Sequence, residues 1–266
     1  RLSIEREYLE SLLRQTMFNN DYLKNLRKLH SKMLRLIQRS GNGPAVAAYE
    51  RFARSKISVK SDQLDTKLHL VAFDNLIFNT RDCQPEPRRR EDYITKQSPV
   101  TYDPTQKAPI FEAAFKKMLP NQQIQDFVQE QAGRLLTPGT ISRQFMFLYG
   151  NTGSNGKSTL TDTLRNILGN YAVKADPSLF LANTRIDHKV KMQLRGKLAA
   201  FASEPSSGQS FNTAMLKEIT GDEKITGNAM GQDLSEFSQT AHLWLSANHL
   251  PKNNESDSVF SERMVP

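Results

Sequence analysis

The run of residues from Gln144 to Gly169 limits the possible folds of this chain more than any other part of its sequence. It opens with QFMFLY, a continuous apolar run of the kind found in strands buried inside a parallel sheet. The glycine-rich loop GNTGSNGKST follows at 150–159, and the residues after it have the spacing of an amphipathic helix. A buried strand, a glycine loop and a helix in this order predict a domain of alternating strands and helices.

The loop comes within one residue of the pattern for phosphate binding, which asks for Gly, four residues and then Gly-Lys-Ser or Gly-Lys-Thr. The GKST part is intact, but Asn151 stands where the first glycine belongs, with glycines on either side at 150 and 153. Glycines still let backbone N–H groups turn inward around an anion, and the dipole of the following helix favours phosphate. The predicted nucleotide site consists of Gly150, Gly153, Asn155, Gly156, Lys157, Ser158 and Thr159.

Lys157 and Ser158 are the two side chains expected to act on a bound nucleotide. In a loop of this kind the lysine reaches the β- and γ-phosphates, and the hydroxyl of the serine is offered to Mg²⁺. Kinases, GTPases, transporters and helicases all carry such a loop, so the strands that follow it must decide between them.

Two later apolar strands are expected to end in polar residues. The run KLAAFAS is followed by Glu204, and AHLWLSAN ends in Asn248. An acid in this position can hold Mg²⁺ and polarise the attacking water, which makes Glu204 the predicted metal ligand and catalytic acid. An amide beside the γ-phosphate can orient water, the role predicted for Asn248. Arg263 is a candidate arginine finger, a guanidinium that stabilises charge in the transition state.

The pattern of the whole chain indicates three parts. These are a basic helical segment at 1–60, a mixed and mostly helical domain at 61–140, and an α/β core at 141–266. Periodicity and turn residues predict short strands and helices, the helix from 121 being capped by Asn121. Strands are expected at 68–73, 76–80, 144–149, 197–203 and 241–248, and helices at 23–39, from 45, at 108–119, 121–136, 187–195 and 213–220.

The excess of positive over negative charge lies in the first part of the chain. Residues 1–60 hold 13 Lys and Arg against five Asp and Glu, whereas residues 61–266 hold 23 of each, so the net charge of +8 lies entirely in 1–60. Most of these cations lie off the apolar stripe of the expected helix. Two interpretations stay open: a solvated helix face, or a surface for a polyanion such as nucleic acid.

The order of these elements resembles superfamily 3 helicases, and more narrowly the primase–helicase family of phages, plasmids, poxviruses and other large DNA viruses. That family shows a loop ending in Asn-Gly-Lys-Ser, a strand ending in Glu, a K-x-x-T-G-G-D element, an N-h-x-P strand tip (h apolar) and an Arg before an apolar strand. The counterparts in this chain are NGKS at 155–158, Glu204, LKEITGD at 216–222, NHLP at 248–251 and Arg263. Including FDNLIF and DYITKQSPVTYDP, which resemble the helical domain before this core, the likeness extends over about 65–266.

The resemblance implies an AAA+-like, three-layer α/β/α core with a parallel sheet, preceded by a mostly helical domain. It implies ATP and Mg²⁺ as cofactors, with Glu204 as the Walker B acid and Asn248 as the sensor. Arg263 would act on the ATP of the neighbouring subunit, and the subunits would form a hexameric ring. Such a ring would translocate on single-stranded or forked DNA.

Lys217 and Lys224 are the candidate DNA-binding residues, because they fall in the element that leads to a DNA-contacting hairpin in this family. The chain departs from the family at two places. It has Gly221-Asp222 where the family has Gly-Gly-Asp, and Gly227-Asn228 where an Arg usually follows the Ile-Thr pair.

Further expectations concern the rest of the protein and its place in the cell. It starts at Arg1 and stops at Pro266, where a strand is expected to begin, so we expect a piece of a longer protein. In the family, a primase domain or partner would belong before Arg1. A lone cysteine, no opening signal peptide and no long apolar run favour an intracellular, cytoplasmic protein that does not enter a membrane.

Two other functions remain open at this level. A small-molecule kinase shares the loop but needs a lid rich in arginines. The only arginines between residues 170 and 240 are Arg185 and Arg195. A non-catalytic module that binds nucleotide and DNA for assembly would explain the displaced first glycine and the single acid. Turnover of ATP that depends on DNA separates the helicase from both.

Overall fold

The computed structural model describes residues 20–139, 143–150, 155–182, 188–203, 211–221, 224–227, 234–249 and 262–265. The chain forms two compact units, Arg1–Ser61 and Asp62–Pro266. The further subdivision near residue 140 stays a prediction.

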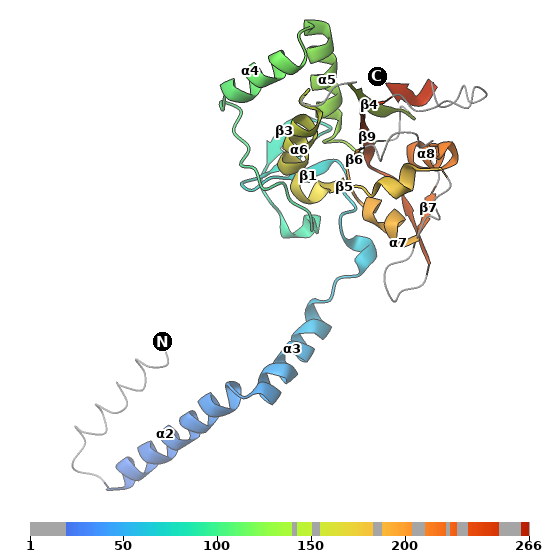
Figure 1. The fold of residues 1–266 in the computed structure, drawn as a ribbon. Coiled ribbons are helices and arrows are strands. Elements are labelled where there is room, and N and C mark those ends of the chain that lie inside the picture. The colour runs from blue at the N-terminus through green and yellow to red at the C-terminus, as the bar shows by residue number, and fades with distance from the viewer. Residues whose placement is uncertain are drawn as a thin grey trace. The chain divides into compact units, whose positions relative to one another are not determined.

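The described part of the first unit consists of two helices, α2 at Asn20–Ser40 and α3 at Gly43–Ile57 (Figure 1). They confirm the two helices expected on either side of the GNGP sequence. Pro44 lies in the first turn of α3, where its missing N–H costs no hydrogen bond and its fixed φ suits the helix. Most side chains of both helices are exposed.

The second unit is built on a sheet of five strands in the order β10-β4-β9-β6-β5. All four neighbouring pairs are parallel, which confirms the predicted α/β class. The strands are β4 at Phe145–Tyr149, β5 at Ala172–Lys174, β6 at Ala199–Ser203, β9 at His242–Ala247 and β10 at Met264–Val265. The carboxyl ends of β4, β9 and β6 therefore lie side by side at one edge of the sheet.

Alternate residues of the strands enter two separate hydrophobic cores, so the sheet is the middle of three layers. Phe145 and Phe147 pack with Leu216 of α8 in one core, whereas Met146 packs with Leu160 of α6 in the other. Figure 1 shows α5 and α6 on one side of the sheet and α7 and α8 on the other. The helices are α4 at Pro109–Met118, α5 at Gln122–Arg134, α6 at Lys157–Leu168, α7 at His188–Lys191 and α8 at Thr213–Thr220.

Hydrogen bonds connect the segment before residue 100 to the sheet domain. The Tyr171 hydroxyl accepts from the Ala72 N–H at 2.9 Å and donates to the Lys96 carbonyl at 3.2 Å. The Ser98 hydroxyl donates to the Ile167 carbonyl at the end of α6, at 2.6 Å. Burial raises the pKa of the Tyr171 phenol, and its two bonds keep this polar group satisfied inside the second core.

Three antiparallel strands precede α4: β1 at Leu70–Ala72, β2 at Ile77–Asn79 and β3 at Gln84–Glu86. The first two were expected from their apolar runs. The third was not among the strands expected from the sequence. Pro85 is tolerated because β3 pairs only with β2 and lies at an edge of this sheet.

Several helix ends follow the sequence closely, and one predicted helix is broken. The Asn121 side chain caps α5, accepting from Gln123 N–H at 2.8 Å, as predicted. The helix expected at 187–195 is instead one short helix, α7, followed by a 3₁₀ turn at Met192–Leu194. Two strands that periodicity did not reveal, β7 at Lys224–Gly227 and β8 at Ser235–Ser238, pair antiparallel.

Close packing fixes the segment that leads into β4. A Cβ on Gly139 would overlap the ring of His242, the first residue of β9. The Nε2 atom of that ring lies 3.2 Å from the Thr137 carbonyl. Burial lowers the pKa of His242, which favours a neutral ring that fits this close contact.

In the part of the chain that the structure describes, every helix is too short or too polar to span a membrane.

Candidate nucleotide site

The predicted site begins where β4 ends and α6 starts. Gly156 caps α6 with φ of 84°, a left-handed conformation that a residue with a Cβ adopts at a cost. The first-turn N–H groups of α6 have no partner within the helix, which makes this end suited to an anion. Gly153 lies outside the described residues.

The glycines at 150 and 156 are needed for space as well as for backbone freedom. A Cβ on Gly150 would overlap the Asn155 side chain and come within 3.2 Å of the Lys157 ammonium. A Cβ on Gly156 would lie 2.5 Å from Cγ and Sδ of Met118. The end of α4 therefore packs directly on the start of the loop helix, a contact that the sequence did not indicate.

The Lys157 ammonium is held by three oxygen atoms at the tips of two strands. It donates to the Gly150 carbonyl at 3.0 Å and to the Asn155 side-chain oxygen at 3.0 Å. It also donates to the Asn248 side-chain oxygen at 2.8 Å. The structure thus brings together two residues that are 91 positions apart in sequence.

Strand register explains why Lys157 and Asn248 meet. Tyr149 pairs with Ala247 across the parallel strands β4 and β9, and the Gly150 N–H donates to the Ala247 carbonyl at 3.3 Å. The residues that follow these strands must therefore emerge beside each other. Their roles with a nucleotide remain predictions.

Of the three other residues proposed for Mg²⁺ and phosphate, the structure describes two. Ser158 and Thr159 lie in the first turn of α6 and are exposed. Glu204 lies outside the described residues; it directly follows β6, whose last residue, Ser203, pairs with Ser246 of β9. Within the described ranges no three His, Cys, Asp or Glu side chains form a group that could hold a metal ion.

A cavity of about 270 Å³ adjoins the loop. Asn155 and Lys157 contribute polar groups to its lining, and most of its other lining residues are apolar. The apolar part comes from the end of α4, from α5, from β4 and from the start of α6, and includes Met118, Leu119, Ile124, Val128, Leu148 and Leu160. A site that combines a cation with an apolar wall suits the phosphates and the base of a nucleotide.

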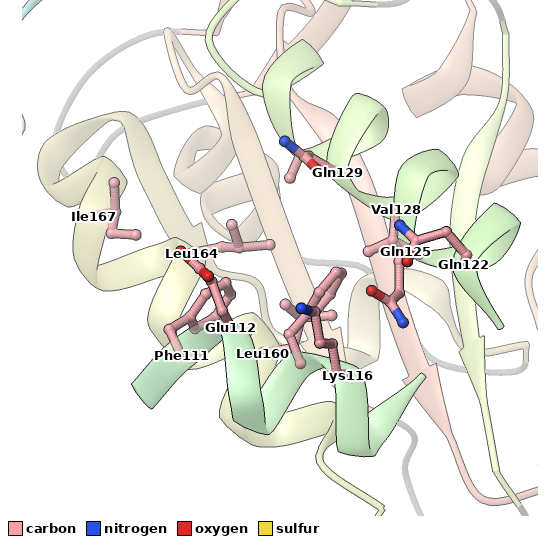
Figure 2. A pocket seen from close by; sticks show the side chains of 12 residues that line it. Phe111, Glu112, Lys116, Gln122, Gln125, Val128, Gln129, Leu160, Leu164 and Ile167 are labelled. Carbon is pink, nitrogen blue, oxygen red and sulfur yellow. The ribbon is translucent and has the colours of Figure 1, made fainter. Parts of the chain in front are cut away.

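A larger groove of about 360 Å³ adjoins this cavity between α4, α5 and α6 and shares Val128 and Leu160 with it (Figure 2). Phe111 and Phe115 of α4 stack at a centroid distance of 5.7 Å along it. Figure 2 shows Val128 from α5 and Leu164 from α6 completing its apolar wall. None of the predicted site residues lines this groove.

Arg263 lies at the amino ends of the strands, whereas the loop lies at the carboxyl end of β4. The strand that follows it, β10, pairs through Met264 with Phe145, the first residue of β4. Since β4 runs on to Tyr149 before the loop begins, about 13 Å of strand separates the two ends. Arg263 is therefore not brought together with Lys157 inside one chain.

The guanidinium of Arg263 contacts the end of α8 instead. It donates to the Thr220 hydroxyl at 2.7 Å and to the Lys217 carbonyl at 3.2 Å. Thr220, which is only 3% exposed, donates in turn to the Leu216 carbonyl at 2.6 Å. The sequence did not indicate Thr220 as a partner of Arg263, because a buried threonine at a helix end has no distinctive pattern.

The candidate DNA-binding lysines lie at and before the hairpin of β7 and β8. Lys217 is half-buried in the last turn of α8. Lys224 is the exposed first residue of β7, and its ammonium lies 4.0 Å from a carboxylate oxygen of Glu236 on β8. The antiparallel hairpin that the resemblance implied is present; whether it contacts DNA stays a prediction.

The fold and the site together define an α/β domain with a glycine loop that follows β4 of its parallel sheet. Family models match most of the chain in two segments. Residues 4–128 match a family described as D5 N terminal like, and residues 148–263 match a family of unknown function, DUF5906.

Curated relatives come from large DNA viruses. The protein named "Putative helicase L207/L206" of Acanthamoeba polyphaga mimivirus is 25% identical over 208 residues, which cover 73% of this chain and 21% of that protein. The protein named "Putative helicase 184R" of Invertebrate iridescent virus 6 is 23% identical over 171 residues, or 60% of this chain and 17% of that protein. The chain spans about a fifth of the length of the curated relatives it matches.

Among solved structures, two of the NrS-1 C-terminal region are similar. One, an apo structure, is 12% identical, covers 77% of this chain and 61% of that chain, and gives a TM-score of 0.44. The other, an apo structure in the A form, is 17% identical, covers 58% and 36%, and gives a TM-score of 0.43.

The chain thus joins a D5-N-terminal-like segment to a DUF5906 segment. Its resemblance to the helicase family of large DNA viruses, predicted from its motifs, is confirmed.

Proposed function

We propose that this chain is the motor part of an ATP-dependent DNA helicase of a viral replication system, which translocates on single-stranded DNA as a hexameric ring. The observation that carries the proposal is the contact between the Lys157 ammonium and the Asn248 side-chain oxygen at the tips of β4 and β9. A phosphate-binding lysine and a polar strand-tip sensor must meet in this way if one is to respond to the charge that the other holds.

ATP is the cofactor that these residues fit. A Cβ at Gly150 or Gly156 would overlap a neighbouring side chain, so glycine is the residue that fits where backbone N–H groups would meet phosphate. Lys157 would exchange its three present oxygen acceptors for phosphate oxygens, and Ser158 and Glu204 would hold Mg²⁺. Mg²⁺ held by these two residues would supply positive charge against the negative charge that develops during hydrolysis.

The position of Arg263 favours an active site shared between subunits. Arg263 directly precedes β10, which begins beside the first residue of β4 and so away from the loop of its own chain, and it would complete the site of a neighbour. An interface that joins two different surfaces closes into a ring when it repeats. Glu204 and Asn248 would position the attacking water in one subunit while Arg263 of the next stabilises the transition state.

The proposal is tested by ATPase activity measured across protein concentration, with and without single-stranded DNA. A shared site predicts that activity per subunit rises steeply with concentration and then levels off, and that DNA raises it further. Activity per subunit that is independent of both concentration and DNA would contradict the ring motor. Nucleotide binding without turnover would favour the assembly module, and phosphorylation of a nucleoside would favour the kinase.

Gly156→Ala is expected to weaken nucleotide binding by about tenfold or more, because a left-handed alanine costs about 1–2 kcal/mol. The new Cβ would also collide with Met118, so adding Met118→Ala should recover part of the loss. Titration of a non-hydrolysable nucleotide with each variant measures both effects.

Gly133→Ala is the matched control, because Gly133 lies in α5 and its Cβ would meet nothing within 4 Å. It should leave binding unchanged. Wild-type affinity in the Gly156→Ala protein would show that this loop does not close around phosphate.

A further inference from the structure

Five cations form one continuous line along α2. We call Lys24, Lys28, Lys32, Arg35 and Arg39 the basic stripe; all five are exposed. At 3.6 residues per turn they fall within an arc of about 80°, and from first to last they extend about 22 Å along the helix.

Asp21 precedes the basic stripe in α2, three residues before Lys24, but no acidic residue lies between the stripe cations themselves. From Tyr22 to Tyr49 the sequence contains no Asp or Glu. In α3, by contrast, Arg54 pairs with Glu50 at 2.7 Å. Among the residues that the structure describes, none of the five stripe cations has an ion pair or a side-chain hydrogen bond.

The apolar side chains of α2 occupy a different face. Leu26, Leu29, Met33, Leu36 and Ile37 fall about 120–220° around the helix from Lys24. The helix can therefore pack through one face while the basic stripe stays in solvent. A merely solvated face normally mixes charges of both signs, and five cations of one sign in a line are costly to hold together without a counter-charge.

We propose that the basic stripe binds the phosphates of a DNA strand, as a contact separate from the β7–β8 hairpin. The five ammonium and guanidinium groups extend over about 22 Å. One DNA strand places roughly six phosphates over that length, at 3.4 Å per nucleotide. Binding would release counterions and carry no sequence preference. The inference rests on the proposed function only in taking DNA as the polyanion.

The test is the salt dependence of single-stranded DNA binding by the full chain, measured by fluorescence anisotropy without nucleotide. Replacing all five stripe residues by Gln keeps helix propensity nearly unchanged. The slope of log affinity against log salt should become shallower by up to about 3.5, at about 0.7 for each lost phosphate contact. Affinity at low salt should fall at least about tenfold, while ATPase activity without DNA stays at the wild-type value.

A control variant removes the same charge elsewhere, by Gln at five exposed cations of the second unit: Arg81, Arg89, Arg90, Lys107 and Lys117. It should keep the wild-type slope. Equal losses in both variants would show a general charge effect and overturn the proposal, as would an unchanged slope in the stripe variant.

Two more measurements guard against other causes. Replacing the three stripe lysines by Arg keeps the charge and should keep DNA affinity; a loss in that variant would overturn the proposal. If the stripe variant loses binding to poly-glutamate but keeps its DNA affinity, the partner is an acidic protein and the DNA proposal is wrong. DNA binding is read without ATP hydrolysis, so failure of the ATPase proposal leaves this result interpretable.

Discussion

Lys157→Ala should lower the rate of ATP hydrolysis by at least about 100-fold, the loss seen when one preorganised charge-stabilising donor is removed. The ammonium is anchored at three points, to the Gly150 carbonyl and to the side chains of Asn155 and Asn248. Phosphate oxygens that replace these acceptors would meet a cation already in position. Steady-state ATPase assays with saturating DNA measure the loss.

Lys174→Ala is the matched control for that substitution. Lys174 ends β5, so it is an exposed lysine at the end of a strand in the same parallel sheet, and its removal should leave turnover near the wild-type value. Wild-type turnover in the Lys157→Ala protein would place the phosphate site elsewhere and remove the main support for an ATPase.

Local signals were sufficient to predict the strand and the helix on either side of the candidate loop. The apolar run before the loop, the glycines within it and the spacing after it predicted β4 and α6 correctly. Asn121 identified the start of α5 because a side-chain cap is a property of a few neighbouring residues. The meeting of Lys157 and Asn248 follows from the parallel order of the strands, since residues after adjacent parallel strands emerge at one edge.

Long-range packing decided what the sequence did not reveal. The strand β5 has only three residues, too few for periodicity to be recognised. The hairpin of β7 and β8 is stabilised by burial of Ile225 and Phe237 in the first core, a tertiary effect that overrides weak local preference. Met118 and Gly156, which are 38 positions apart in sequence, bring the end of α4 against the start of α6. No pattern within either helix predicts this contact.

Arg263 also has one feature that the sequence predicted and one that depends on long-range packing. Sequence predicted that a strand follows it, and β10 confirms this. Sequence did not reveal its bonds to the end of α8. Those bonds link the residue proposed to act on a neighbour's ATP to the helix that leads toward β7, through Lys217 and Thr220. A change in the contacts of Arg263 would therefore shift the end of α8 and with it the hairpin proposed to hold DNA. This would couple ATP hydrolysis to DNA binding, as a motor requires.

Arg263→Ala should lower ATP turnover by about 1,000-fold or more, the usual effect of losing an arginine finger, while nucleotide binding is retained. The alternative is that Arg263 is only an internal link between β10 and α8. Thr220→Val separates the two, because it keeps the shape of the buried side chain but removes the hydroxyl that accepts from Arg263. It should cost roughly 1–3 kcal/mol of stability, measured by denaturant unfolding, yet keep most of the turnover.

Mixing two inactive proteins decides whether the site is shared. The Lys157→Ala protein keeps Arg263, and the Arg263→Ala protein keeps Lys157, so an interface between one of each can hold a complete site. In randomly mixed rings roughly a quarter of the interfaces would be of this kind, and ATPase activity should reappear at about that fraction of the wild-type value. No recovery after exchange of subunits, shown by mass measurement of mixed rings, would mean that Arg263 serves its own chain. Because β10 begins beside the first residue of β4, at the edge of the sheet away from the loop, recovery is the expected result.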